Sequence, residues 1–235
     1  MFRKSTTILA SMLGVATAVA AHAAPLDTAA SAPAQTAPSQ ASTPTEPSLA
    51  AVRAATERFR DVKVALAEGY IRDPFDLCDT ADMMGQPAER GAMGIHYVRP
   101  DLLGISGPPN PRVDGTGTHT DFLTPAILIY EPQADGALEL VAVENLVFRQ
   151  AWHAAGHDAP PSFHGVTYDV MVDDPATTVD EAHMFEAHYD RHVWIYRTNP
   201  NGVFAPFNPN VTCKHHRNGA HQHHASGHQQ HASGK

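Results

Sequence analysis

Residues 126–144 of the sequence read AILIYEPQADGALELVAVE, and this stretch decides the fold. Both ends, 126–131 and 137–144, are rich in apolar residues, many of them β-branched, whereas the middle contains Pro132 and Gly136. Two apolar runs joined by a short segment that contains glycine are typical of a β-hairpin. We therefore expect two antiparallel strands here, joined by a tight connection.

The segments on either side of this hairpin extend the same pattern. Alternating apolar residues predict three further strands, at residues 92–98, 163–172 and 192–197. Residues 104–124 are rich in Gly, Pro, Asn and Asp, which is typical of a long loop. The sequence contains no internal repeat. The predicted sheet is therefore mostly antiparallel.

Three helices are expected around this sheet. Ser48 can cap a first helix, because apolar residues recur after it every three or four positions. A second helix is expected at residues 145–155. Thr178 followed by Glu181 is a capping-box pattern for a third helix, which would end near His188. The predicted fold class is a single α+β domain with an N-terminal helix and short flanking helices.

The N-terminus has the three parts of a secretory signal peptide. Arg3 and Lys4 give a basic start, and residues 8–21 form a short apolar run. Residues 21–23 read Ala-His-Ala, which is an A-x-A cleavage pattern. The apolar run is shorter than the roughly 20 residues of a membrane-spanning helix, and no later segment is long and apolar enough to cross a bilayer. We therefore expect removal of residues 1–23 and a periplasmic or secreted protein without a membrane span.

Composition divides the rest of the chain into three parts. Residues 24–47 are almost all Ala, Pro, Ser, Thr and Gln, and residues 214–235 are dominated by His, Gln, Gly, Ala and Ser. Neither composition can bury enough apolar surface to fold, so we expect a disordered linker and a disordered tail. Residues 48–213 have the composition of one globular domain with its own core.

The charge balance argues against nucleic acid as a partner. The chain has 16 Lys+Arg and 25 Asp+Glu, which gives a formal net charge of −9. Loss of Arg3 and Lys4 with the signal peptide would make the charge about −11. Phosphate binding needs clustered Lys and Arg, whereas an acidic surface attracts cations and basic partners.

The two cysteines, Cys78 and Cys213, stand near the start and the end of the predicted domain. An isolated pair in an oxidising compartment usually forms a disulfide. Closing a loop of this length is worth roughly 4–5 kcal/mol in the chain-entropy model. We expect this disulfide, and the alternative is two separate thiols.

Histidine is the residue type that stands out. The chain has 16 histidines, and seven of them lie in the tail: His215, His216, His221, His223, His224, His228 and His231. Neutral imidazole is the commonest metal ligand and suits zinc, copper and nickel. Dense His tracts with small polar spacers are typical of metal binding. We expect the tail to bind transition metal ions. The alternatives are that it only keeps the protein in solution, or that it was added by engineering.

Inside the domain, His96, Glu144 and His192 each belong to a different predicted strand. Strand alternation puts Glu144 on the face of Leu138 and Leu140, where a carboxylate needs a cation, a metal or several donors. Two His and one carboxylate are a recognised ligand set for zinc, and for iron(II) when positions stay open. We therefore expect a metal site, with zinc or copper as the cofactor.

His183 and His188 lie close to His192 in the sequence. If a helix continued to His192, His188 and His192 would lie at i and i+4 and could bind one metal ion. The aromatic and β-branched residues after His192 favour a strand instead. We include His188 among the candidate metal ligands.

Two other interpretations are compatible with these residues. The histidines could hydrogen-bond backbone carbonyls while Glu144 pairs with Arg149 or Arg191, which would describe a non-catalytic binding domain with a structural polar core. An open coordination position would instead describe a metalloenzyme, with Glu144 as ligand or general base. The sequence contains no nucleophile motif or phosphate-binding glycine loop, so hydrolysis would have to be metal-assisted.

Several motifs carry a resemblance to known proteins. They are residues 91–98 (GAMGIHYV), residues 141–144 (VAVE), and residues 192–213, which contain HVW, NPNG, NPN and the second cysteine. With these motifs the domain resembles an uncharacterised family of secreted bacterial proteins, and more remotely the oil-body-associated protein family of plants and its microbial relatives. The resemblance selects the same His96, Glu144 and His192 and implies no reaction. The His-rich tail and Asn145 depart from the family pattern.

Overall fold

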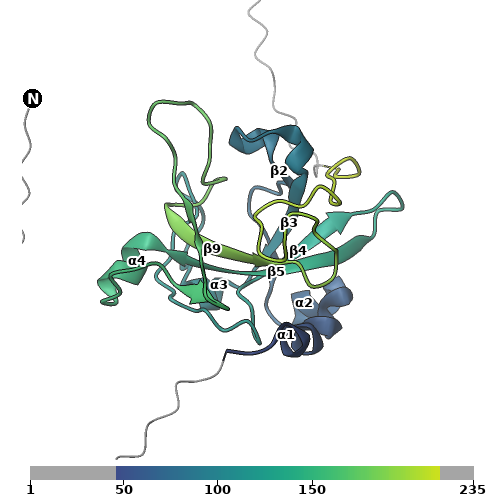
Figure 1. The fold of residues 1–235 in the computed structure, drawn as a ribbon, viewed down its shortest axis with the longest axis horizontal. Helices are drawn as coiled ribbons and strands as arrows, with labels where there is room; N and C mark the ends of the chain where they lie inside the picture. The colour runs from purple at the N-terminus through teal and green to yellow at the C-terminus, as the bar shows by residue number, and fades with distance from the viewer. Residues whose placement is uncertain (1–45, 218–235) are drawn as a thin grey trace, which may run out of the picture. The chain divides into compact units, whose positions relative to one another are not determined.

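The computed structural model describes residues 46–217, so the predicted signal peptide, almost all of the linker and residues 218–235 of the tail lie outside the described residues. Within residues 46–217, a sheet of seven strands is accompanied by four short α-helices (Figure 1). Every pair of neighbouring strands in this sheet is antiparallel. The predicted α+β class with a mostly antiparallel sheet is confirmed.

The strands of the large sheet, in spatial order, are β1 (Ile71–Arg72), β3 (Ala92–Val98), β4 (Ile127–Pro132), β5 (Leu138–Phe148), β9 (His188–Val193) and β8 (Asp169–Met171), and β2 (Asp79–Thr80) also pairs with β3. A separate small sheet consists of β6 (Ser162–Phe163) and β7 (Val166–Thr167). The α-helices are α1 (Leu49–Thr56), α2 (Val62–Ala67), α3 (Pro100–Leu103) and α4 (Arg149–Ala154). Short 3-10 helices are η1 (Glu57–Arg60), η2 (Asp82–Met84) and η3 (Ala88–Arg90). None of the helices in this part of the chain is long and apolar enough to cross a membrane.

The hairpin predicted from residues 126–144 is present as β4 and β5, but β5 is longer than expected. It continues to Phe148, so the helix predicted from residue 145 begins only at Arg149. Residues 145–148 pair with β9, and the side chain of Asn145 accepts a hydrogen bond from the backbone of Ala126. These tertiary contacts override the local helical pattern.

Two other predicted elements are interrupted. The first helix is divided into α1, η1 and α2, because Asp61 leaves the helical conformation and its side chain caps the start of α2. The strand predicted at residues 163–172 is divided into β6, β7 and β8. His164 and Gly165, both with positive φ, make the turn between β6 and β7.

The helix predicted between Thr178 and His188 is absent, and this prediction was wrong. The Glu181 carboxylate accepts hydrogen bonds from the backbone of Asp174 and the hydroxyl of Thr177, so it holds a loop rather than a helix start. The last strand begins at His188 instead of His192, and it ends at Val193. The register of this strand decides which side chains enter the interior.

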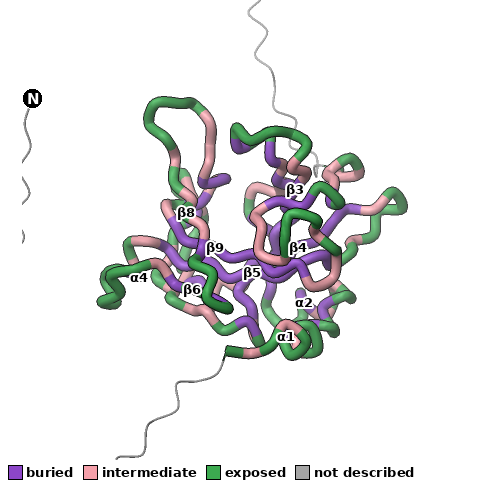
Figure 2. Tube along the Cα trace, viewed as in Figure 1, coloured by how far each residue is buried: buried purple, intermediate pink, exposed green. Residues whose placement is uncertain are grey.

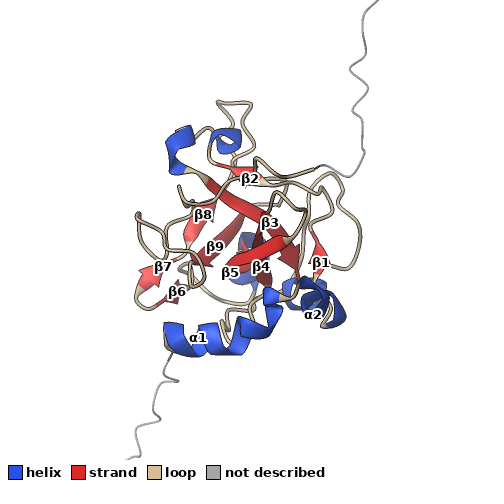
Figure 3. Cartoon of the chain, turned by 90° about the vertical axis from the view of Figure 1, so that its right-hand side faces the viewer, coloured by secondary structure: helices blue, strands red, loops and turns tan. Residues whose placement is uncertain are grey.

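The central strands β3, β4 and β9 and most of β5 are buried, and they stand out as the purple part of the trace in Figure 2. The face that we call the helix-covered face packs against α1, η1 and α2, which lie together along one side of the sheet in Figure 3, and its core includes Phe59, Tyr130 and Val143. The face that we call the loop-covered face packs against long connections, with Val113 and Phe185 in its core. A parallel bridge between those two residues ties two of these connections together.

The C-terminal segment, residues 208–213, is bonded to β3 and to Cys78, the residue before β2. Ala92 forms an antiparallel bridge with Asn208, and a Cβ atom at Gly91 would lie only 2.1 Å from the Asn208 carbonyl oxygen, so glycine is required there. The predicted disulfide between Cys78 and Cys213 is present, and the described part of the chain contains no free cysteine. The alternative of two separate thiols was wrong.

Candidate metal centre

His96, Glu144 and His192 lie on β3, β5 and β9, and all three belong to the loop-covered face. Glu144 is the register partner of His192, so their side chains leave the sheet on the same side. His96 alternates with Ile95 and Tyr97, which pack on the helix-covered face. The structure therefore brings together the three residues that the sequence selected.

The predicted face of Glu144 needs one correction. The pairing of β4 with β5 shifts register between Ile129 and Tyr130, which leaves Val141 as an extra residue. Leu138 and Leu140 consequently pack on the helix-covered face, and Glu144 lies on the opposite one. The prediction that Glu144 shares a face with these leucines was wrong, although its burial was predicted correctly.

The three side chains meet at ligand distance inside the protein. His96 Nε2 lies 3.3 Å from Glu144 Oε2, and His192 Nε2 lies 3.5 Å from the same oxygen. Donor atoms about 2.0–2.2 Å from a tetrahedral metal ion lie about 3.3–3.6 Å from one another. The exposed fractions are 1 % for His96 and 0 % for Glu144 and His192. We call these three residues the primary triad.

A second carboxylate orients His96. The Nδ1 atom of His96 lies 2.9 Å from Asp79 Oδ2, on β2. A proton on Nδ1 would be donated to Asp79 and would leave the Nε2 lone pair directed at Glu144. A carboxylate that fixes the ring of a metal-binding histidine in this way is a common arrangement around metal ions.

Glu144 does not pair with either arginine that could have neutralised it. Arg191 lies 3.3 Å from Asp169 Oδ2 and donates to the backbone carbonyl of Phe204. The Arg149 guanidinium lies over the ring of Tyr189, at 5.6 Å from its centre. The interpretation of Glu144 as half of an arginine ion pair was therefore wrong.

Three more ligand-type residues surround the primary triad, and we call them the neighbouring triad: His183, His188 and Asp190. One donor atom from each lies within 4.8 Å of the others, and all three residues are buried. The His183 ring stacks on His96 with 5.6 Å between ring centres, and Asp190 Oδ2 lies 3.8 Å from His192 Nδ1. The two triads thus form one buried cluster.

Most of the donor atoms in this cluster have no hydrogen-bond partner within residues 46–217. They include both carboxylate oxygens of Glu144 and of Asp190, both ring nitrogens of His183 and of His192, and Nε2 of His96 and of His188. A buried polar group without a partner costs about 1–3 kcal/mol in mutational data. A structural hydrogen-bond network would satisfy such atoms, so their concentration here points to a ligand.

The protonation states of three of the four histidines suit metal binding. Burial lowers the pKa of His188 and of His192 to about 4 and that of His183 well below its usual value. These imidazoles are therefore neutral near pH 7, with a lone pair free. His96 differs: burial disfavours its charged form, but Asp79 and Glu144 outweigh burial and hold the pKa of His96 well above the usual value. A metal ion bound by His96 would therefore have to displace a proton.

The pKa values of the two carboxyl groups, Glu144 and Asp190, are shifted in opposite directions. Burial would raise the pKa of Glu144, but His192 and His96 lower it to about 2, so this group is ionised. Burial raises the pKa of Asp190 well above its usual value, and the nearby charges of Glu144 and Asp169 raise it further. A divalent cation would favour the ionised form of both groups.

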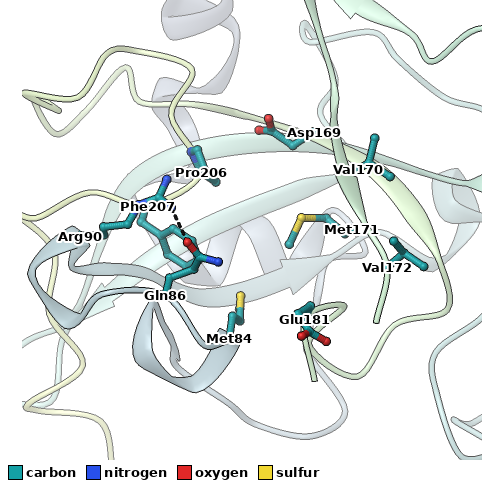
Figure 4. Close-up of a pocket in the computed structure, with 10 residues that line it drawn as sticks. All are labelled: Met84, Gln86, Arg90, Asp169, Val170, Met171, Val172, Glu181, Pro206 and Phe207. Carbon is teal, nitrogen blue, oxygen red and sulfur yellow. Dashed lines mark hydrogen bonds between the residues drawn. The ribbon is translucent and has the colours of Figure 1, made fainter. Parts of the chain in front are cut away.

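The structure separates the tail histidines that it describes from this cluster. His215 and His216 line a pocket with the β4–β5 turn, and His216 Nε2 lies 3.4 Å from Asp76 Oδ1. His221, His223 and His224 lie outside the described residues. Figure 4 shows another pocket, of about 320 Å³, lined by side chains that include Met84, Met171 and Phe207 and by none of the two triads.

Comparisons with models of protein families, with curated proteins and with solved structures found no match. The resemblance to secreted bacterial proteins and to the oil-body-associated family therefore stays a prediction. The site has to be interpreted from its own geometry.

Proposed function

We propose that this protein is an exported transition-metal-binding protein that holds zinc or copper through His96, Glu144 and His192. One observation carries the proposal: donor atoms from three separate strands converge inside the protein and have no hydrogen-bond partner among residues 46–217. A bound cation would satisfy these atoms at once. Strands in the centre of a sheet would hold the ligands rigidly in place.

The donor set favours a borderline transition metal. Two imidazoles and one carboxylate suit zinc, copper and related ions better than calcium or magnesium, which prefer oxygen ligands alone. Asp79 would act on the metal indirectly, through His96.

Two features support an exported protein that encounters metal ions outside the cytoplasm. The N-terminal residues 1–23 have the pattern of a signal peptide, and the Cys78–Cys213 disulfide suits an oxidising compartment. The His-rich tail would bind additional ions more weakly than the primary triad does. Periplasm and external medium are both compatible with these features.

The burial of the site favours metal binding over catalysis at the primary triad. A metalloenzyme keeps one coordination position open to water and substrate, and the exposed fractions of 0–1 % do not support an open position here. A purely structural polar core would leave few donor atoms unpaired, and the triads do not fit that description either. A closed metal site accounts for both the burial and the missing hydrogen bonds.

The test compares metal content and thermal unfolding with and without a chelator. The parent is the mature chain with the seven tail histidines replaced by Asn, so that only the domain contributes; the seven are His215, His216, His221, His223, His224, His228 and His231. We expect this parent to retain stoichiometric zinc or copper, and a metal concentration of 100 Kd to stabilise it by about 2.7 kcal/mol. The unmodified tail should add weaker equivalents.

Substitutions assign the metal to the primary triad. His96→Ala and His192→Ala should each abolish tight binding and the chelator-sensitive part of the melting temperature. The control is His164→Asn, which removes an exposed histidine whose positive φ also suits Asn. A parent that contains no metal, binds neither zinc nor copper on addition and melts identically in chelator would overturn the proposal.

A further inference from the structure

The neighbouring triad is a complete ligand set by itself. His183, His188 and Asp190 offer two imidazoles and one carboxylate, the same donor types as the primary triad, with donor atoms within 4.8 Å of one another. Its members come from β9 and from the connection that precedes it, whereas the primary triad draws on β3, β5 and β9. Only β9 contributes to both.

His188 is oriented for binding by its own surroundings. Its Nδ1 atom lies 2.9 Å from the backbone carbonyl oxygen of Glu186, which accepts the ring proton, and its Nε2 atom has no hydrogen-bond partner in the described chain. This tautomer leaves the Nε2 lone pair free inside the protein. A histidine whose second nitrogen is fixed by a carbonyl group is a usual ligand arrangement in metal sites.

His183 is held inward by strained backbone. His183 and Met184 have φ values of 40° and 71°, a left-handed conformation that is costly for residues other than glycine. The Asp180 carboxylate accepts a hydrogen bond from the Met184 backbone at 3.0 Å, and the Met184 carbonyl accepts one from Val113 at 2.9 Å. These contacts keep the His183 ring buried although neither nitrogen has a hydrogen-bond partner. Metal binding by the His183 ring would explain why the protein keeps this strained backbone and buries the ring.

The carboxyl oxygens of Asp190 also have no hydrogen-bond partner among the described residues. Asp79, Glu144 and Asp190 place three carboxylates around the two triads, and all three are buried. Within residues 46–217, the one basic group recorded at ion-pair distance from Asp190 is His192, at 3.8 Å. One ion at the primary triad would leave the Asp190 oxygens unsatisfied, whereas an ion beside Asp190 would satisfy them.

From these observations we propose that His183, His188 and Asp190 form a second transition-metal position, so that the buried cluster holds two ions side by side. This inference rests on the proposed function, because a second ion beside the primary triad implies a first ion within it. The stacked His96 and His183 rings, 5.6 Å apart, would separate the two positions. Zinc and copper are the expected ions, as at the primary triad.

The test loads the parent chain with copper(II) and measures two independent quantities. Elemental analysis gives the number of ions per chain, and electron paramagnetic resonance reports whether two copper ions interact magnetically. We expect two ions per chain and a spectrum broadened by coupling. Both measurements use the parent itself, so the test holds even if a variant fails to fold.

The variant His183→Asn assigns the second position, because Asn tolerates the left-handed backbone but is a poor ligand for these ions. It should lose at least one ion and all of the magnetic coupling. His164→Asn is the matched control, since His164 also has positive φ, at 51°, but lies exposed and outside both triads, and it should keep two ions.

The outcomes separate this inference from the proposed function. A parent with one uncoupled ion that His183→Asn retains would overturn the second position and leave the primary triad intact. Two ions that persist in His183→Asn would overturn the assignment of the second position to these residues. A parent that binds no ion would overturn both proposals.

Discussion

The two faces of the large sheet are buried to the same degree but by different kinds of residue. The helix-covered face is an apolar core in which Phe59, Tyr130 and Val143 pack together. The loop-covered face has an apolar core of its own, but it also buries four histidines and several carboxylates. Two of the strands, β5 and β9, supply both faces with alternate side chains.

Under the proposed function, the helix-covered face serves stability and the polar cluster on the loop-covered face binds metal. Apolar burial on the helix-covered face stabilises the folded domain. The polar cluster on the other face opposes folding unless a ligand satisfies it, because its donor atoms have lost water without gaining partners. We therefore expect substitutions on the helix-covered face to lower stability and leave metal content unchanged. Substitutions in the polar cluster should instead lower metal content and leave the stability of metal-free protein unchanged.

The largest effect is expected on the helix-covered face. Phe59 is fully buried, packs its ring edge-on against Tyr70 at 5.0 Å, and its carbonyl accepts a hydrogen bond from Tyr130. Phe59→Ala should lower the free energy of unfolding by about 3–5 kcal/mol. Denaturant unfolding measures this loss, and metal analysis of the folded variant should give the same content as the parent. A loss of metal that follows the loss of stability would mean that the faces are not independent.

The sequence predicted the central sheet well because alternation and turn chemistry are local. The β4–β5 hairpin and β3 follow from apolar runs bounded by Gly, Pro and Asp. The elements that failed depend on distant partners. Residues 145–148 extend β5 because β9 pairs with them, and the segment before His188 is a loop because Asp180 pairs with Arg112 at 2.9 Å.

The sequence predicted the primary triad but only His188 of the neighbouring triad, again because local patterns can be recognised and distant contacts cannot. His96, Glu144 and His192 could be found because each occupies a strand position that alternation directs inward. Asp190 was missed because the last strand was expected to begin at His192; once β9 begins at His188, alternation directs His188, Asp190 and His192 to one face. The inward position of His183 depends on a left-handed turn that no local pattern indicates.

The next effect is a pH dependence that belongs to the loop-covered face. His188 and His192 have pKa values of about 4 in the folded protein, below the usual 6.5, because burial disfavours their charged forms. As pH falls from 6.5 to 4, the unfolded chain takes up protons that the folded chain does not, so stability should fall. The expected loss is on the order of 3 kcal/mol for each group.

His96 should act in the opposite direction, and this makes the pH profile diagnostic. Its raised pKa contributes stability at low pH, and this contribution is lost as pH rises through the folded-state value. Denaturant unfolding of metal-free protein in chelator, from about pH 8 to pH 4.5, measures the combined slope. Phe59→Ala should displace the whole curve without changing its slope. If the parent and His192→Ala gave the same metal-free slope between pH 6.5 and about pH 4.5, the burial of a neutral His192 would be contradicted.

The smallest effect on the free energy of unfolding is expected from His192→Leu, which should leave metal-free protein as stable as the parent or make it more stable. In the described part of the chain, neither ring nitrogen of His192 has a hydrogen-bond partner, and the ring stacks on Trp194 with 5.9 Å between ring centres. Leucine would fill similar space without an unsatisfied polar atom, so metal-free protein should keep its stability or gain about 1–2 kcal/mol. The same substitution should abolish tight metal binding, because it removes one of the three ligands of the primary triad.

The matched control is the next residue along β9. Val193 packs on the helix-covered face and is the register partner of Val143. Val193→Ala should therefore lower the stability of metal-free protein and leave metal content unchanged, the reverse of His192→Leu on both counts. Denaturant unfolding in chelator and metal analysis, measured on the two variants in parallel, give the comparison. If His192→Leu instead lost about 2 kcal/mol or more without metal, His192 would be part of the structural core, and the loop-covered face would serve stability in the same way as the helix-covered face.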